Sequence, residues 1–382
     1  MAPLISWIRD IVVPSGEKTA REAYGIDGWT AHVVANPWGF TSLGWSYRWG
    51  TFLMGGVWCA LLLWDYYEYE RDLDFLRQTA YPILLGAARF VLRHLFLDPE
   101  SGYWMTGPSY SPENWFLVDG QEYCLDLSTT CDILLVREIF RTVLRCAELL
   151  SRPETPRLRE IKSCLENLPP YRIGKYGQLQ EWFHDHEEAI PNHRHTSHLL
   201  GVYPFTQIHP CKEPELAEAA VISLERRLTD HELTSWAGNM ITSIYARLWK
   251  AEDAWKILNH TICTLGEKNL SIIMPPMFND WPATWELDGN TGLVSAICEM
   301  FAQCSWNGYE YELYLLPALP EAWSEEEIKG MRLRGGFSLD LKWQDGKAAT
   351  AAVTAVMPEK IKVFYEGKEI FCGQISMRTD CL

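Results

Sequence analysis

Apolar residues recur at three- and four-residue spacing along most of the chain, up to about residue 306. Near residue 85, for example, Ile83, Leu84, Ala87, Ala88 and Val91 would share one face of a helix. This spacing predicts helices over 15–24, 52–71, 74–97, 128–151, 155–166, 211–228, 235–249, 251–265 and 291–305. The loops between them, at 25–49, 98–127, 171–210 and 266–290, are long for helix connections, and long ordered loops tend to carry function.

The period changes to two from Leu333 onward. Phe337, Leu339, Leu341 and Trp343 alternate with polar or small residues, and Asp345–Gly346 marks a hairpin turn. We therefore expect two domains, a helical one over 1–310 and a small β-sandwich over 311–382. Paired helices joined by long loops favour an α/α toroid, in which the paired helices form two rings and the site lies at one mouth. The alternative is an α-solenoid, which should show a repeat of about 30–45 residues; we find no such repeat.

Composition narrows the class of partner. The chain has 382 residues, a net charge of −16 and a pI near 5.1, which argues against binding to nucleic acid or to an anionic membrane surface. It contains 18 Trp, 17 Tyr and 14 Phe. Most of these rings belong in a large helical core, but a few exposed ones would suffice to stack on sugar faces.

The 11 cysteines are scattered and lack Cys-x-x-Cys spacing, which indicates free thiols rather than disulfides or a zinc site. No signal peptide is visible in the first ten residues, and the apolar run 55–64 is too short to span a bilayer. We expect a cytoplasmic protein, although a segment upstream of this chain could hold an export signal. No cofactor is implied, and the oligomeric state is not readable from the sequence.

Two loop segments each place one carboxylate among Pro, Gly, Asn and aromatic residues. Glu113 lies in Ser-Pro-Glu-Asn at 111–114, and Asp288 in Trp-Glu-Leu-Asp-Gly-Asn at 285–290. Two loop carboxylates without a phosphate-binding pattern are what cleavage of a glycosidic bond requires. In a chain with 50 acidic residues such a pair alone is weak evidence. Each carboxylate also has a structural alternative, a helix N-terminal acid for Glu113 and a turn residue for Asp288.

The chain resembles glycoside hydrolase family 95, the inverting α-L-fucosidases with an (α/α)6 catalytic barrel. The resemblance runs from about Ala23 to Trp343 and rests on six blocks in the same order. The blocks are Gly-Trp-Thr-Ala-His at 28–32 with Asn-Pro-Trp-Gly at 36–39; Gly-Gly-Val-Trp at 55–58 with Trp-Asp-Tyr-Tyr at 64–67; Ser-Pro-Glu-Asn at 111–114; Leu-Gln-Glu-Trp at 179–182 with His-Arg-His-Thr-Ser-His-Leu at 193–199; Asp-Gly-Asn at 288–290; and Leu-Leu-Pro-Ala-Leu-Pro at 315–320 with Lys-Gly-Met-Arg at 329–332.

By this resemblance Glu113 is the general acid and Asp288 the general base. Trp115 and Phe116 would give Glu113 an apolar setting that keeps it protonated, while Gly289 and Asn290 could supply donors that keep Asp288 ionised. An inverting enzyme needs the two carboxyl groups roughly 6.5–9.5 Å apart to admit a water molecule.

The resemblance also implies residues that contact the sugar. His193, Arg194, His195 and His198 fit sugar hydroxyl contacts best, with packing and metal binding as alternatives, and we expect no metal there. For the remaining candidates a structural role is equally open: His32, Asn36, Trp38, Glu181, Trp236 and Asn290. Asp132, on a predicted helix, could pair with Arg194.

The chain departs from the family before Gly28. Members of the family carry there two closely spaced asparagines that help to position the hydrolytic water, and further upstream a large β-domain and a helical linker. Val33 and Asn36 replace a histidine and an aspartate that are typical of the first block. We expect a barrel truncated at its N-terminus, in which Asn36 is the first candidate to position the water.

Three functions remain open on the sequence alone. The first is an exo-acting α-L-fucosidase that acts on a fucosylated oligosaccharide or glycan, and the second is an α-L-galactosidase of the same family. The third is an inactive fragment that only binds carbohydrate.

Overall fold

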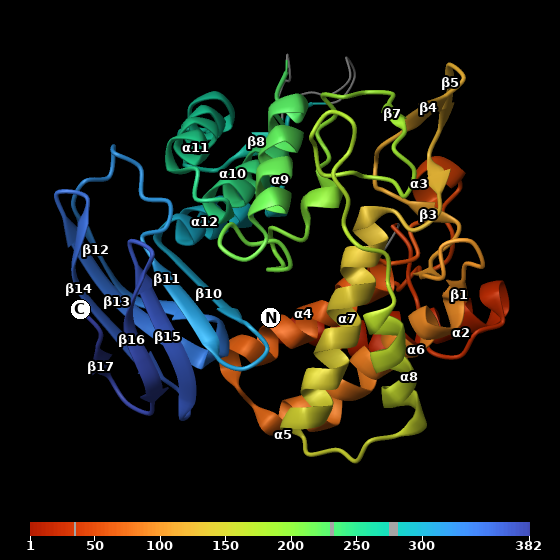
Figure 1. Cartoon of the computed structure of the whole chain (residues 1–382), viewed down its shortest axis with the longest axis horizontal. Coiled ribbons are helices and arrows are strands. Elements are labelled where there is room, and N and C mark those ends of the chain that lie inside the picture. The colour runs from red at the N-terminus through yellow and green to blue at the C-terminus, as the bar shows by residue number, and fades with distance from the viewer. Residues whose placement is uncertain (34–35, 230–232, 275–281) are drawn as a thin grey trace. The chain divides into compact units, whose positions relative to one another are not determined.

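The structure, a computed structural model, describes residues 1–33, 36–229, 233–274 and 282–382. They form two compact units (Figure 1). The first unit comprises Met1–Tyr67 and Asp72–Pro191, and the second comprises Glu68–Arg71 and Asn192–Leu382. The domain boundary that we predicted near residue 310 marks the change from helices to strands, whereas the two compact units divide between Pro191 and Asn192. The boundary near residue 310 stays a prediction.

The first unit is built mainly of helices. Its longest helix, α7, begins at the N-cap Thr129, whose hydroxyl accepts a hydrogen bond from the amide of Asp132. The apolar face of α7 packs against α6 and α8 (Figure 1). The helices are α1 (Ala2–Trp7), α2 (Val13–Tyr24), α3 (Tyr47–Gly50), α4 (Gly55–Glu70, whose last residues belong to the second unit), α5 (Leu73–Phe75), α6 (Tyr81–His94), α7 (Thr130–Leu149) and α8 (Pro156–Glu166), with π-helical turns at Ile8–Val12 and Leu76–Ala80.

Short strands organise the loop that was expected over 98–127. They are β1 (Phe96–Leu97), β2 (Trp104–Met105), β3 (Ser109–Tyr110), β4 (Phe116–Val118), β5 (Gln121–Tyr123) and β6 (Leu125–Asp126), and β7 (Glu187–Glu188) joins them from further along the chain. β3 pairs with β6, and β4 pairs with both β5 and β7, all antiparallel. These strands hold residues 111–115 between two strand pairs.

The helices of the second unit are α9 (Pro214–Arg227), α10 (Ser235–Arg247), α11 (Ala251–Leu265) and α12 (Leu287–Phe301), with a 3-10 turn at Ser197–Leu199 and the strand pair β8 (Ile273–Met274) and β9 (Thr284–Trp285). α10 packs against both α11 and α12 (Figure 1). None of the helices among the described residues has the length and apolar character needed to cross a bilayer.

The helix expected over 291–305 is shifted in the structure. α12 begins at Leu287, because Asp288 suits a first helical turn and Gly289 lies against α10, where a Cβ would come within 2.8 Å of the Ser235 hydroxyl. The helix ends at Phe301, because residues 302–306 pair as a strand with residues 311–315. Asp288 therefore lies on a helix rather than in a loop.

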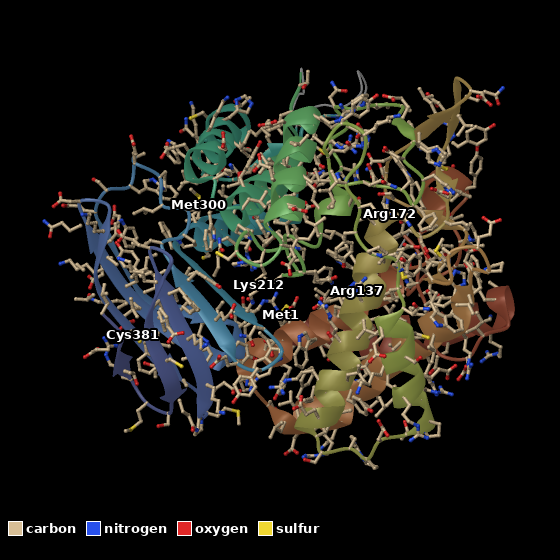
Figure 2. All side chains as sticks on the ribbon, in the orientation of Figure 1. Met1, Arg137, Arg172, Lys212, Met300 and Cys381 are labelled. Carbon is tan, nitrogen blue, oxygen red and sulfur yellow. The ribbon has the colours of Figure 1, made fainter. Side chains whose placement is uncertain are left out.

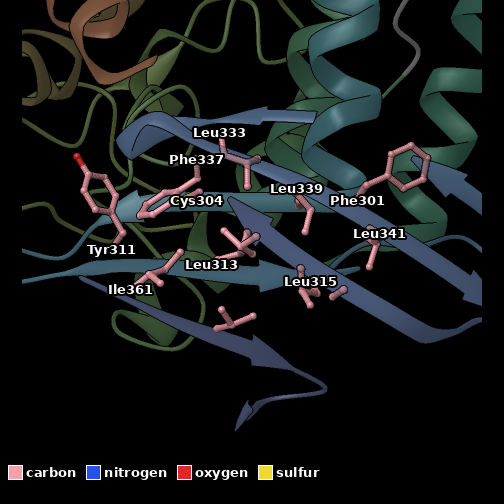
Figure 3. Packing of buried hydrophobic residues seen from close by; sticks show 14 of the residues in the cluster. Phe301, Cys304, Tyr311, Leu313, Leu315, Leu333, Phe337, Leu339, Leu341 and Ile361 are labelled. Atoms are coloured by element: carbon pink, nitrogen blue, oxygen red, sulfur yellow. The ribbon is translucent and has the colours of Figure 1, made fainter. Parts of the chain in front are cut away.

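The chain ends in two four-stranded sheets. One has the order β10-β11-β15-β16, with β11 and β15 parallel, and the other has the order β12-β13-β14-β17. The strands are β10 (Ala302–Trp306), β11 (Tyr311–Leu315), β12 (Glu326–Leu333), β13 (Phe337–Gln344), β14 (Lys347–Ala355), β15 (Glu359–Tyr365), β16 (Lys368–Ile375) and β17 (Thr379–Asp380). Side chains from both sheets share one buried cluster, which includes Leu313, Phe337 and Leu339 (Figure 3). The turn predicted at Asp345–Gly346 joins β13 to β14, with positive φ at both residues.

Candidate active site

Glu113 lies in a tight turn between β3 and β4. The amide of Asn114 donates to the carbonyl oxygen of Ser111 at 2.8 Å and closes this turn. Ser111 and Asn114 are buried, whereas Glu113 is half-buried. The strand pairs on either side fix the ends of the turn, so that Glu113 is presented by a braced segment.

The buried carboxylate of Glu181 anchors this turn by hydrogen bonds. It accepts hydrogen bonds from the Ser111 hydroxyl at 2.6 Å and from the Asn114 side-chain amide at 2.5 Å. The backbone carbonyl of Glu181 also accepts from the amide of Thr130 at the start of α7. Glu181, a candidate for sugar contact, thus has a positioning role in the first unit.

Asp132 supports the strand that precedes the turn. The Ser109 hydroxyl donates to its carboxylate at 2.6 Å. Burial raises the pKa of Asp132 to about 7, against the opposing effect of hydrogen bonds from Ser109 and Thr106. An ion pair with Arg194, which belongs to the second unit, stays a prediction.

His32 is a buried histidine with both ring nitrogens engaged. Nδ1 lies 2.7 Å from the carbonyl oxygen of Thr41 and Nε2 lies 2.7 Å from the Tyr24 hydroxyl. Because a carbonyl only accepts, Nδ1 carries the proton and Nε2 accepts from Tyr24. Burial lowers the pKa of His32, against the hydrogen bond to Thr41. This geometry fits the structural alternative that the sequence left open.

Asn36 and Trp38 lie in one loop with different roles. The side-chain oxygen of Asn36 accepts from the amides of Trp38 at 3.1 Å and Phe40 at 3.2 Å, so it shapes the loop. Trp38 is 84% exposed as a residue, and Trp45 is 77% exposed. Exposed indole faces of this kind are suited to stacking on sugar rings.

A cavity of about 180 Å³ lies beside Trp115, two residues after Glu113. The guanidinium of Arg48 lies over the Trp115 ring, 5.3 Å from its centroid, and 3.6 Å from the Glu122 carboxylate. The lining residues are Tyr47, Arg48, Trp115, Glu122, Tyr123, Cys124 and Leu125. The pocket therefore combines aromatic faces with charged groups that can form hydrogen bonds. It lies close to the Glu113 turn.

In the second unit, the histidine loop packs against the start of α10. The rings of His193 and His195 stack with centroids 5.0 Å apart, and His195 meets Trp236 edge-on at 4.7 Å. Arg194 donates to the Nε2 atom of His193 at 3.3 Å. These four side chains are half-buried, and His198 is buried. The structure thus adds Trp236, which the sequence offered as a separate candidate, to the group of His193 and His195.

Asp288 lies exposed in the first turn of α12. Its carboxylate accepts from the backbone amide of Gly289 at 2.9 Å, a donor of the kind that the sequence analysis expected. The side chain of Asn290 is used elsewhere: it donates to the carbonyl oxygens of Ile272 at 2.8 Å and Glu286 at 2.6 Å, and it accepts from the amide of Ile272. Asn290 therefore fixes the start of α12 to the segment before β8.

Glu286 is a second carboxylate at this helix start that the sequence analysis did not single out. It accepts a hydrogen bond from the buried Ser235 hydroxyl at the start of α10. Burial raises the pKa of Glu286, against the Ser235 hydrogen bond, and the charge of Asp288 adds to the rise. The signal in the sequence was its position two residues before Asp288.

Metal binding was considered for the histidines at 193–198. Among the residues that the structure describes, the three side chains whose donor atoms lie close enough for a metal ion are instead Asp126, His184 and His186. They belong to the first unit, and no local sequence pattern connects them, because Asp126 lies 58 residues from His184.

Comparison with solved structures bears on the fold. A putative kojibiose phosphorylase from the human microbiome matches with a TM-score of 0.62 at 11% identity, over 97% of this chain and 55% of that chain. This likeness confirms the expected fold, an (α/α)6 toroid followed by a β-sandwich domain.

Comparison with curated proteins points the same way. Alpha-L-fucosidase 2 of Arabidopsis thaliana is 32% identical over 372 residues, which cover 96% of this chain and 43% of the relative. Probable alpha-fucosidase A of Aspergillus niger is 30% identical over 365 residues, which cover 90% and 44%. The chain thus spans less than half the length of these curated relatives.

The comparison with family models covers nearly the whole sequence. Residues 1–301 match the glycosyl hydrolase family 95 catalytic domain, and residues 308–378 match the C-terminal domain of the same family. The chain belongs to glycoside hydrolase family 95.

Proposed function

We propose that this chain is the catalytic part of a glycoside hydrolase that removes terminal α-L-fucose from glycans with inversion at the anomeric carbon. The observation that carries the proposal is that the stretch matching the family's catalytic domain, residues 1–301, includes both candidate carboxylates, Glu113 and Asp288. The name of the Arabidopsis relative, alpha-L-fucosidase 2, supports the choice of sugar.

In this proposal Glu113 protonates the leaving oxygen and Asp288 removes a proton from the attacking water. The braced turn supports the role of Glu113, because a general acid must be held within hydrogen-bond reach of the leaving oxygen. The exposed position of Asp288, with the Gly289 amide as donor, supports a carboxylate that is held in place and that water can reach.

Aromatic and imidazole side chains would bind the sugar. Trp38 offers an exposed indole face, and the cavity beside Trp115 offers space for a further part of the glycan. In the second unit His193, His195 and Trp236 supply ring faces and hydrogen-bonding nitrogens within one cluster. Asn36, Asn290 and His32 would act through the shape of the site, because their side chains are engaged within the protein.

The test is hydrolysis of an aryl α-L-fucoside by the purified chain, followed by proton NMR during the first minutes. Inversion requires the β-anomer of fucose as the first product. A first-formed α-anomer would overturn the inverting mechanism. An aryl α-L-galactoside assayed in parallel distinguishes the α-L-galactosidase alternative, because the two sugars differ only in the hydroxyl at C6.

A second candidate is a carbohydrate-binding chain without turnover. It is favoured by the span of this chain, 43% of the length of the Arabidopsis relative. By the family resemblance, the asparagine pair that positions the water lies upstream of the first shared block. A poorly oriented water can cost on the order of 100-fold in rate. Binding of L-fucose by these 382 residues without hydrolysis of an aryl α-L-fucoside would support this second candidate.

For the compartment, we propose the reducing cytoplasm. All eleven cysteines lie among the described residues, no disulfide joins any two of them, and five of them are buried. Mass tagging of free thiols in protein extracted from its native cells tests this, since an oxidising compartment would leave some of the exposed thiols blocked.

A further inference from the structure

We propose that Asp126, His184 and His186 form a binding site for a divalent transition-metal ion, with Zn²⁺ as the best-fitting ion. Asp126 ends β6, and the two histidines lie in the loop that leads into β7. The site belongs to the first unit. Metal binding can be measured whether or not the chain hydrolyses a fucoside, so this proposal does not depend on the proposed function.

The donor atoms already converge. Nδ1 of His184 lies 3.0 Å from Oδ1 of Asp126, and Nε2 of His186 lies 3.4 Å from Oδ2. One donor atom from each of the three residues lies within 4.8 Å of the others. Ligands bound at 2.0–2.1 Å in a tetrahedron are about 3.3 Å apart, so a small closure of the histidines would complete the geometry.

The protein holds these side chains in place by contacts of its own. The His186 ring stacks on Phe116 with centroids 4.0 Å apart and planes 7° apart. The carboxylate of Asp185, between the two histidines, accepts from the amide of Lys175 at 2.7 Å. Arg172, which Figure 2 labels, donates to the carbonyl oxygen of Phe183, the residue before His184, at 3.1 Å. The protein's own contacts therefore fix the loop that carries His184 and His186 before any ion binds.

The exposure of the three side chains suits an ion that enters from solvent. Asp126 is 8% exposed, His186 is 20% exposed and His184 is 57% exposed. The carboxylate of Asp126 is therefore the most buried of the three ligands, and His184 is the most exposed. Three protein ligands leave a fourth position for water, as in zinc sites that are open to solvent.

The chemistry of the donors selects the ion. Two imidazoles and one carboxylate suit Zn²⁺, Co²⁺, Ni²⁺ or Cu²⁺, whereas Mg²⁺ and Ca²⁺ prefer oxygen ligands only. Asp185 in the same loop and Glu187 and Glu188 in β7 add negative charge, although Glu187 pairs with Lys175 at 2.9 Å. A dication is thus favoured by both the ligands and their surroundings.

An ion here would tie together the strands that carry the Glu113 turn. β6 pairs with β3, which enters the turn, and β7 pairs with β4, which leaves it. Asp126 ends β6, and His186 immediately precedes β7. Bound metal would therefore raise the thermal stability of the chain, because it links segments that separate on unfolding.

The experiment measures binding of Zn²⁺ and Co²⁺ to the chelator-stripped chain by equilibrium dialysis and elemental analysis. We expect about one ion per chain and an absorption spectrum of Co²⁺ typical of nitrogen and oxygen ligands, without the thiolate bands that cysteine binding would produce. His184→Gln should weaken binding at least ~10-fold, since even losing an outer-shell partner of a metal ligand has an effect of that size. Zn²⁺ should raise the melting temperature of the wild type but not of the variant.

His260→Gln is the matched control, because His260 is an exposed histidine on α11 of the second unit and should leave binding unchanged. His184 is exposed enough for its variant to fold, and the melting temperature without metal verifies this. Equal binding by wild type and His184→Gln, or no binding at micromolar Zn²⁺, would overturn the proposal. In that case Asp126 acts only as a hydrogen-bonding partner that holds two imidazoles.

Discussion

The Ser111 hydroxyl donates a hydrogen bond to the Glu181 carboxylate at 2.6 Å, across 70 residues of sequence. Asn114 donates to the same carboxylate, so the first and last residues of the Ser-Pro-Glu-Asn turn are fixed to one buried acid. Glu113 lies between these two contacts. The direction in which Glu113 points is therefore controlled by a residue that the sequence places in a different block.

Replacing Glu181 should misplace Glu113 without removing it. Both hydrogen bonds end on the same oxygen of Glu181, so in Glu181→Gln the side-chain oxygen can still accept them, but without the negative charge of the carboxylate both become weaker. We expect a fall in kcat on the order of 10- to 100-fold with little change in KM, and a loss of about 1–3 kcal/mol in unfolding free energy.

Ser111→Ala tests the same contact from the other side. Because the two residues share one hydrogen bond, the effects of Ser111→Ala and Glu181→Gln on kcat and on unfolding should not add in the double variant. Strict additivity in both measurements would show that Glu181 does not position the turn.

Glu113→Gln tests the general acid directly. Loss of the proton donor should lower hydrolysis of a natural fucosylated glycan by at least ~100-fold. An aryl fucoside with a good leaving group should lose less, because its oxygen needs less protonation. The matched control is Glu100→Gln, an exposed turn residue of the same unit. Wild-type rates on the natural glycan would remove Glu113 from the role of acid.

Asp288→Asn tests the general base, with Asp253→Asn as control. Both aspartates lie in the first turn of a helix of the second unit and are exposed, so helix effects should be similar in the two variants. We expect kcat to fall at least ~100-fold in Asp288→Asn and to stay unchanged in Asp253→Asn. Glu286→Gln should cost less than Asp288→Asn, and a larger loss in Glu286→Gln would reassign the base to Glu286.

Asp132 should make stability depend on pH. Burial raises its pKa from an ordinary 3.8 to about 7, so the folded chain holds this proton more tightly than the unfolded chain. Its contribution is fully present below about pH 4 and is lost as the pH rises through about 7, a change on the order of 4 kcal/mol at most.

Denaturant unfolding at about pH 5 and about pH 8 measures this effect. The uncharged, near-isosteric Asp132→Asn should be less sensitive to the change of pH than the wild type. Asp119→Asn, an exposed turn substitution, should behave as the wild type does. If Asp132→Asn keeps the full pH dependence of the wild type, the proton is held elsewhere.

The sequence by itself determined the elements whose pattern is local. Strand β13 alternates buried and more exposed residues because every second residue is a large apolar one: Phe337, Leu339, Leu341 and Trp343. The expected helices over 128–151 and 251–265 appear as α7 and α11, because one apolar stripe at helical spacing defines each of them. The Glu113 turn was also visible, since Pro and Asn have strong local preferences.

Only the tertiary structure decided what each polar side chain contacts. Asn290 was a candidate for the sugar, yet its amide is used by Ile272 and Glu286. His32 was equally open, and Tyr24 and Thr41 occupy both of its nitrogens. Asp126 meets His184 although the sequence separates them by 58 residues. Hydrogen bonds and ion pairs act over about 3 Å, and which distant residues come within that distance depends on how strands and helices pack.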